Sequence, residues 1–202
     1  MKLLGISGRK GSGKTSLATR ITLEPGYGRV VRVAMAEPIK HIAVDILGLP
    51  PALVYGDDDA KQQLTQYYAH DMPGFPRDDY SQLSVRRVLQ ILGTEIFRHM
   101  DSDIWIKTLF RRIATYDVDL VIVDDVRFAN EADAIKRAEG KLVRLLRHHA
   151  NRSDNHVSEN AVDDYEGWDL VVPDLPPNAT FLRVANMLET YVHTNPLREG
   201  TT

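Results

Sequence analysis

Residues 8–15 read Gly8-Arg9-Lys10-Gly11-Ser12-Gly13-Lys14-Thr15, a glycine-rich loop between a short apolar strand, Lys2–Ser7, and a helix predicted for about Lys14–Ile21. The loop matches the pattern G-x-x-x-x-G-K-[ST] in the strand–loop–helix context that this phosphate-binding motif requires. Its glycines allow backbone conformations that a Cβ atom would forbid, so successive N–H groups can point at phosphate oxygens. The positive end of the following helix adds to this field. The sequence therefore predicts a nucleoside triphosphate site.

The residue types in and near this loop suggest individual roles. Lys14 would bridge the β- and γ-phosphates, and the Thr15 hydroxyl would bind Mg²⁺. The residues expected to contact the nucleotide are Arg9, Lys10, Gly11, Ser12, Gly13, Lys14, Thr15 and Ser16. An apolar strand predicted for Asp119–Asp124 runs into Asp125, and one of these two acids would hold Mg²⁺ through water or orient the attacking oxygen. Because neighbours on a strand point opposite ways, the strand alone does not choose between Asp124 and Asp125, and the other acid would cap the next helix.

The composition limits the class of protein. The chain has 202 residues, 43% apolar and 26% charged, which excludes disorder over most of its length. It has no cysteine, which excludes disulfides, thiolate zinc sites and a cysteine nucleophile. A net charge of −3 argues against a nucleic-acid polymer as a partner. No apolar run approaches the roughly 18 residues of a membrane helix, and the start turns glycine-rich too early for a signal peptide. We therefore expect a cytoplasmic protein without a membrane partner.

Short apolar strands alternate with helical segments along most of the chain, which predicts an α/β fold with a parallel central sheet covered on both faces. Further strands are expected at Arg29–Ala36, Lys141–Leu146 and Asp169–Val172, and helices at Ser84–Met100, Phe128–Ala138 and Asn178–Tyr191. Ser84 is the expected N-cap of its helix. Prolines and acids interrupt the pattern over Leu49–Tyr80, so this stretch is expected to be an insert or a mobile flap rather than core. The core of a single domain would comprise 1–48, 117–147 and 166–192, with a helical region and flap at 49–116 and a frayed tail at 193–202.

Several segments in order resemble one family. They are the glycine-rich loop, Ala36-Glu37-Pro38-Ile39-Lys40, Arg86–Glu95 with Arg98 and Trp105, Asp125–Glu131, and His156–Glu159. Together they are similar to the deoxynucleoside monophosphate kinases of bacteriophages, a branch of the adenylate-kinase-like P-loop kinases with a three-layer sandwich fold. The Leu-Gln-x-Leu-Gly-Thr segment, which begins at Leu89, and the Asp-Val-Arg-Phe-x-Asn-Glu segment, which begins at Asp125, are the most specific of these. The resemblance runs from about Lys2 to Tyr191.

This resemblance implies direct in-line transfer of the ATP γ-phosphoryl group to a deoxynucleoside 5′-monophosphate, with Mg²⁺ as cofactor. It favours Asp125 as the acid that binds the metal together with Thr15. The residues that it implies in catalysis are Lys14, Asp125, Arg127, Arg147 and Arg152. Those that it implies in monophosphate binding are Glu37, Lys40, Arg86, Gln90, Arg98, Trp105, Arg127 and Glu131. Trp105 has a core position as an equal alternative, and Glu37 departs from the Asp that the pattern usually carries, as Pro173 does from an Asn.

The family also implies a lid that closes over ATP, expected at 148–165. Arg147 and Arg152 are candidates to reach the transferring phosphoryl group from there. His148, His149 and His156 could be interpreted as a zinc site, but exposed histidines are the simpler interpretation. Three functional alternatives stay open: the deoxynucleotide kinase, a kinase of another small phosphorylated metabolite such as dephospho-coenzyme A or phosphomevalonate, and an ATP-binding regulatory module. The base of the acceptor and a homodimer stay open too. A phage-encoded chain would work in the cytoplasm of the infected host cell.

Overall fold

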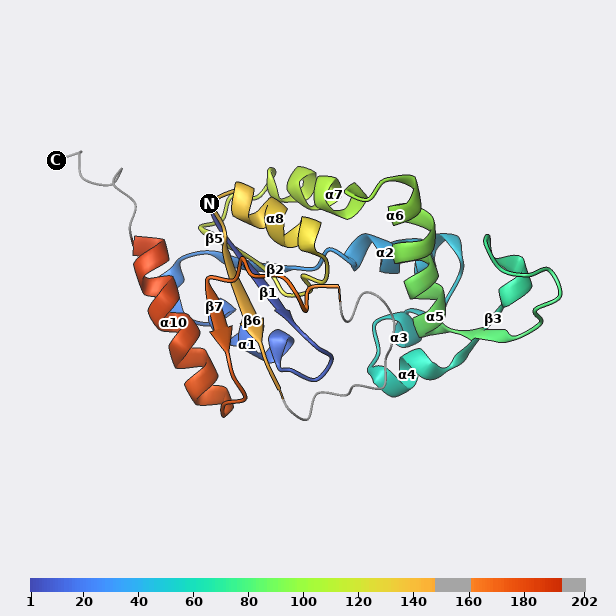
Figure 1. Ribbon diagram of the computed structural model, residues 1–202, viewed down its shortest axis with the longest axis horizontal. Helices are drawn as coiled ribbons and strands as arrows, with labels where there is room; N and C mark the ends of the chain where they lie inside the picture. Colours follow the sequence, from blue (N-terminus) through green and yellow to red (C-terminus); the bar gives the residue numbers. More distant parts are fainter. Residues whose placement is uncertain (148–160, 194–202) are drawn as a thin grey trace. The chain divides into compact units, whose positions relative to one another are not determined.

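The glycine-rich loop follows β1 (Lys2–Gly8), which lies at the centre of a five-stranded sheet in the computed structural model (Figure 1). Residues 1–147 and 161–193 are described. The chain divides into two compact units. The sheet unit comprises Met1–Met35 and the described residues after Lys107, and the helical unit comprises Ala36–Lys107. The sequence analysis predicted a helical region and flap at 49–116 within a single domain, and these bounds stay a prediction.

The sheet confirms the parallel α/β fold predicted from the sequence. Its strands are ordered β2 (Val30–Val33), β5 (Leu120–Val123), β1, β6 (Lys141–Leu145) and β7 (Leu170–Val172), and each neighbouring pair is parallel. Residues 3–6 of β1 and all of β5 are buried, which explains their nearly continuous apolar sequences. The chain fills one side of β1 with β2 and β5 before it crosses to β6 on the other side. Ligands of such sheets bind where the strand order reverses, at the carboxyl ends of the strands.

Helices cover both faces of this sheet. The helices α1 (Lys14–Thr22) and α10 (Pro177–His193) pack on one face, where their side chains join those of alternate strand residues in a common apolar core (Figure 1). The opposite face carries α8 (Ala129–Arg137), which packs on β1 and β6. There a Cβ atom on Gly5 would lie 2.7 Å from Cδ1 of Ile135, so the glycine allows the helix to approach the strand closely. The short 3₁₀ helix η1 (Pro25–Tyr27) precedes β2.

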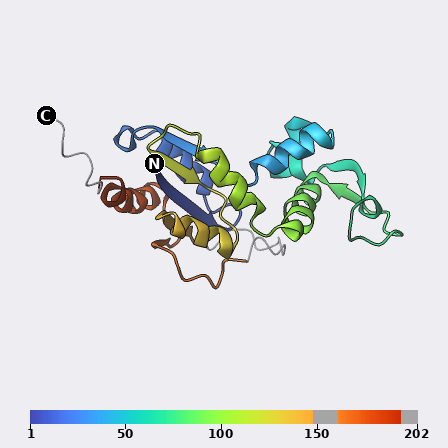
Figure 2. The same cartoon turned by 90° about the horizontal axis from the view of Figure 1, so that it is seen from above.

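The helical unit corrects the prediction of a flap over Leu49–Tyr80. This stretch forms α3 (Pro51–Val54), α4 (Asp58–Gln62), β3 (Leu64–Tyr68) and η3 (Ala69–Asp71), and β3 pairs with β4 (Gln82–Ser84) in an antiparallel hairpin. Figure 2 shows this hairpin extending away from the helices of the unit. Leu49 and Val54 are fully buried. The proline and acid residues that suggested an interruption mark the starts of helices. Pro51 begins α3, and the Asp57 carboxylate caps α4.

The remaining helices of this unit are α2 (Glu37–His41), the π-helical η2 (Ile42–Ile46), α5 (Val85–Gln90), the π-helical η4 (Ile91–Ile96) and α6 (Phe97–Met100), and α7 (Ile104–Ile113) crosses into the sheet unit. Among them, α5, η4 and α6 lie within the helix predicted for Ser84–Met100. The Ser84 hydroxyl accepts a hydrogen bond from the Arg87 N–H, which confirms the predicted N-cap. Gly93 lies in the π-helical segment, where a Cβ atom would come within 2.8 Å of Ile39. No described helix is both long and apolar enough to cross a membrane.

Candidate nucleotide-binding site

The glycine-rich loop has the backbone conformation that its sequence predicts. Gly13 caps α1 with φ of 89°, in the left-handed region that favours glycine. At Gly8 a Cβ atom would lie 2.5 Å from Oγ of Ser12 and 2.8 Å from the Leu145 carbonyl oxygen. The Lys14 ammonium donates to the carbonyl oxygens of Gly8 and Arg9, at 2.5 and 2.9 Å, which holds it across the loop. Oγ of Ser12 is buried and makes no hydrogen bond within the described residues, so the loop contains an unsatisfied polar group.

A buried acid adjoins the hydroxyl that follows the loop lysine. Oγ1 of Thr15 donates to Oδ2 of Asp124 at 3.3 Å, and Nε of Arg32 lies 3.4 Å from the same oxygen. The Asp124 side chain is 6% exposed. Burial raises the pKa of Asp124 and the Asp125 charge raises it further, while Arg32 and Thr15 act in the opposite direction. A buried carboxylate and a hydroxyl are oxygen donors of the kind that Mg²⁺ prefers.

Asp125 contacts the chain that follows β2. Its Oδ1 accepts a hydrogen bond of 2.8 Å from the N–H of Met35, which follows β2. The side chain therefore ties the end of β2 to the end of β5. The structure thus places Asp124 beside Thr15, and the assignment of Asp125 as the metal-binding acid stays a prediction.

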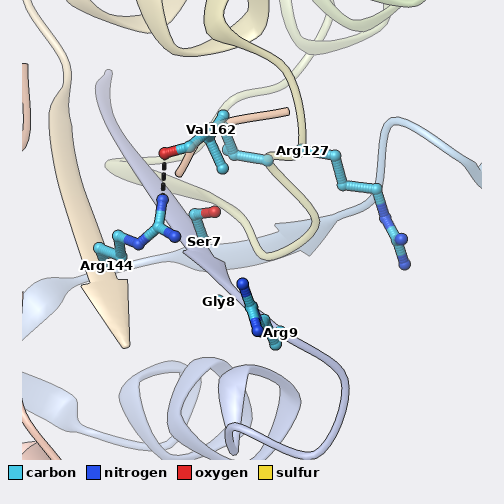
Figure 3. Close-up of a pocket in the computed structure, with 7 residues that line it drawn as sticks. Ser7, Gly8, Arg9, Arg127, Arg144 and Val162 are labelled. Carbon is cyan, nitrogen blue, oxygen red and sulfur yellow. Dashed lines mark hydrogen bonds between the residues drawn. The ribbon is translucent and has the colours of Figure 1, made fainter. Parts of the chain in front are cut away.

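Three arginines line a small pocket at the carboxyl end of β1 (Figure 3). Arg9 belongs to the glycine-rich loop, Arg127 follows β5, and Arg144 lies on β6 opposite Ser7 of β1. The remaining lining residues are Ser7, Gly8, Val126 and Val162. The sequence analysis missed Arg144, whose only sequence signal is a single charge inside the apolar strand 141–145.

Asp163 is the counterion of two of these arginines. Its Oδ2 lies 2.7 Å from Nη2 of Arg9, and its Oδ1 accepts a hydrogen bond from Nη2 of Arg144. Arg144 also donates to the Val162 carbonyl oxygen (Figure 3) and lies over the Trp168 ring. Burial alone would raise the pKa of Asp163, but the hydrogen bonds from the two arginines lower it overall. Asp163 therefore holds Arg9 and Arg144 in place next to the pocket.

Arg147, which follows the end of β6, also contacts the glycine-rich loop. Its Nε donates to the Ser12 carbonyl oxygen at 3.3 Å, and its Nη1 donates to Asp174 at 2.8 Å and to the Leu175 carbonyl. Arg147 thus joins the loop to the segment after β7. Arg152, predicted together with it, lies outside the described residues.

Several residues predicted to bind the monophosphate gather in the helical unit. Nζ of Lys40 lies 3.3 Å from Oε2 of Glu37 and 5.1 Å from the centre of the Tyr55 ring. Arg86 pairs with Asp58, and its Nε is buried without a hydrogen-bond partner in the described parts of the chain. Gln90 follows Arg86 by one helical turn on α5, and Arg98 lies on α6. This part of the unit is therefore rich in cations.

Comparison with known proteins identifies the family. The model of the family described as deoxynucleotide monophosphate kinase matches residues 52–174, more than half of the chain. The chain belongs to the deoxynucleotide monophosphate kinase family. It is 28% identical over 185 residues to a protein of Acanthamoeba polyphaga mimivirus provisionally named a deoxynucleotide monophosphate kinase, and the match covers 85% of this chain and 88% of that relative.

Two phage proteins are also similar. The chain is 25% identical over 182 residues to the deoxynucleoside-5′-monophosphate kinase of Escherichia phage T5, with 66% of this chain and 71% of the relative covered. It is 24% identical over 137 residues to the deoxynucleotide monophosphate kinase of Enterobacteria phage T4, with 66% and 57% covered. These comparisons confirm the family resemblance found in the sequence. They identify the chain as a member of a family of nucleotide kinases.

In this kinase two residues predicted to bind the monophosphate are buried and contribute to the fold. Trp105 is 6% exposed, donates from Nε1 to the Gly93 carbonyl at 2.9 Å, and packs edge-on against Phe97. Glu131 is 3% exposed, and its Oε2 accepts from the backbone N–H groups of Arg127 and Phe128 at 2.8 and 3.1 Å. Glu131 therefore caps the start of α8 and fixes the backbone at Arg127. The burial of Trp105 agrees with its core alternative, and a role of either residue in monophosphate binding stays a prediction.

The lid predicted for this kinase at 148–165 is described only over its last residues. Within 161–165, Asp163 binds Arg9 and Arg144, and the Tyr165 hydroxyl donates to Asp133 at 3.0 Å. The predicted tail lies outside the described residues from 194 onward, as do His148, His149 and His156. Among the described residues, no three His, Cys, Asp or Glu side chains are grouped as metal ligands.

Proposed function

We propose that this chain transfers the γ-phosphoryl group of ATP to the 5′-phosphate of a deoxynucleoside monophosphate, with Mg²⁺ as cofactor. An oxygen of the acceptor phosphate attacks the γ-phosphorus, and the bond from the γ-phosphorus to the β–γ bridging oxygen breaks. The products are ADP and a deoxynucleoside diphosphate. A phosphate monoester is largely ionised at pH 7, so its oxygen needs no general base.

The observation that carries this proposal is the arrangement of Lys14, Thr15 and Asp124 around the glycine-rich loop. Lys14 would release its carbonyl partners and bind the β- and γ-phosphates, and Oγ of Ser12 would gain the partner that it lacks. Thr15 and Asp124 would hold Mg²⁺, directly or through water, because their oxygens adjoin in a buried position. The metal, when bound, neutralises part of the phosphate charge.

The arginines of the pocket would stabilise the charge of the transferring group. Arg9, Arg127 and Arg144 present guanidinium groups, which suit phosphate oxygens better than lysine does. Because Asp163 already holds two of them, they are positioned before the substrate arrives. Arg147, which binds the Ser12 carbonyl, would support the loop under the nucleotide.

An acceptor panel tests this function. ADP release from Mg·ATP is measured with the four common deoxynucleoside monophosphates, their ribonucleotide counterparts and no acceptor. We expect release that depends on a deoxynucleotide, and the panel ranks the bases. Release that is equally fast without an acceptor would make the chain an ATPase and contradict the proposal.

A further inference from the structure

The proposed reaction uses Asp124 but gives no role to Arg32, the charged residue of the otherwise apolar strand β2. Arg32 lies opposite Ile122 of β5 in the sheet. Because side chains alternate along a strand, Arg32, Ile122 and Asp124 project to the same face of the sheet. That face carries α1, and Nη1 of Arg32 donates to Oγ1 of Thr19 on this helix at 3.3 Å. The register of the sheet therefore places a guanidinium group beside Asp124.

Arg32 and Thr15 contact the same oxygen of Asp124. Oδ2 lies 3.4 Å from Nε of Arg32 and 3.3 Å from Oγ1 of Thr15. The Asp124 side chain is 6% exposed, so water solvates its charge poorly and a nearby cation is needed to compensate for burial. Arg32 supplies this cation from a neighbouring strand.

Arg32 can leave this oxygen more easily than Asp124 can move. The Arg32 side chain is 41% exposed, so its guanidinium group can turn towards water at little cost in desolvation. Thr19, its other contact, is an exposed residue of α1 and can keep the guanidinium group near the site. A divalent cation and a guanidinium group on one carboxylate oxygen repel each other, so the two compete for Asp124.

We propose that Arg32 is the counterion of Asp124 until Mg²⁺ arrives with the nucleotide, and that Arg32 then gives up Oδ2 to the metal. The proposal rests on the metal-binding role of Asp124 in the proposed function and adds a positioning residue to it. Arg32 would hold the buried carboxylate beside Thr15 before the metal binds. Its competition would also weaken the hold on the metal, so that Mg·ADP can leave after the reaction.

Thermal unfolding of wild type and Arg32→Gln tests this exchange, with saturating ADP and either EDTA or Mg²⁺ present. In EDTA the variant leaves a buried carboxylate without its counterion, so it should melt about 2–4 °C below wild type. Mg²⁺ supplies the missing charge, so the difference should close or change sign when Mg²⁺ replaces EDTA. Arg29→Gln is the matched control. Arg29 precedes β2 and pairs with the exposed Asp117, so its effect should be the same in EDTA and in Mg²⁺.

Binding of Mn²⁺ to the ADP complex, measured by electron paramagnetic resonance, gives the sign of the effect directly. Loss of a competing cation predicts that Arg32→Gln binds Mn²⁺ about 2- to 5-fold more tightly than wild type. Arg32→Lys keeps the charge and should stay closer to wild type. In an Asp124→Asn background Arg32→Gln should change Mn²⁺ binding little, because the carboxylate for which the cations compete is gone.

Two results would overturn this proposal alone. One is a difference in melting temperature between wild type and Arg32→Gln that is the same in EDTA and in Mg²⁺, which would make Arg32 a purely structural residue. The other is weaker Mn²⁺ binding by Arg32→Gln, which would mean that Arg32 assists the metal instead of competing with it. Failure of the underlying function looks different, because Asp124→Asn alone would then bind Mn²⁺ in the ADP complex as tightly as wild type.

Discussion

Oγ1 of Thr15 lies 3.3 Å from Oδ2 of Asp124, although 109 residues separate them in the chain. The contact follows from the sheet, because β1 and β5 are parallel neighbours and both end at the same edge. The glycine-rich loop leaves β1 there, and Asp124 directly follows β5. Sheet topology therefore brings a hydroxyl and a carboxylate together where a triphosphate would carry its metal ion.

Replacement of Asp124 by Asn should slow turnover without a loss of stability. The raised pKa of Asp124 means that its ionised form costs folding free energy, and that stability grows as pH falls through the folded-state pKa towards the unfolded-state value near 4. A neutral Asn removes this cost, so the melting temperature of the free protein should stay equal or rise. Turnover should fall by about 10- to 100-fold, with a higher Mg²⁺ requirement. Thermal melting and Mg²⁺ titrations of the rate check both.

Asp125→Asn is the matched control for this prediction. Its amide oxygen can still accept from the Met35 N–H, so we expect turnover close to wild type. A large loss in Asp125→Asn with little loss in Asp124→Asn would return the metal-binding role to Asp125.

Trp105→Phe should change stability and leave substrate binding intact. Phe keeps most of the apolar packing but leaves the Gly93 carbonyl without its indole donor. We expect a loss of about 1–3 kcal/mol in the free energy of unfolding, measured with urea. The KM for the monophosphate should stay within about twofold of wild type. A large rise in KM at unchanged stability would support base stacking instead.

Asp163→Asn should weaken the fold in a pH-dependent way. The lowered pKa of Asp163 means that its contribution is complete above its unfolded-state pKa near 4 and is lost as pH falls through the folded-state value. The partners Arg9 and Arg144 lose their counterion, and screening by water limits the cost to about 1 kcal/mol at pH 7. Urea unfolding between pH 7 and pH 3 should show wild type and variant converging at acid pH. A difference that persists unchanged at pH 3 would show that the charge is not its cause.

Much of the fold could be predicted because its signals are local. Continuous apolar strands mark β1 and β5, and Ser84 caps its helix as expected. The helices α3 and α4 were missed because four and five residues are too few to show a helical period. Pro51 and Asp57 start these helices, but without a helical period of apolar residues after them they indicate a loop.

The residues of the candidate site also differ in how far the sequence predicts them. Lys14 and Thr15 belong to a motif with fixed spacing, so the sequence alone predicts their roles. Arg144 is a single charge in an apolar strand, and only its neighbours in the folded chain indicate that it lines the pocket. The choice between Asp124 and Asp125 depends on which way each side chain points, and spacing along the chain does not contain this information.

Transfer of label from [γ-³²P]ATP tests the central claim most directly. Wild type and Lys14→Met are incubated with Mg²⁺ and each deoxynucleoside monophosphate, and the products are separated. We predict label in a deoxynucleoside diphosphate with wild type, and almost none with Lys14→Met. Label that appears only as inorganic phosphate, or equal transfer by Lys14→Met, would contradict the assignment of this loop as the site of phosphoryl transfer to a deoxynucleotide.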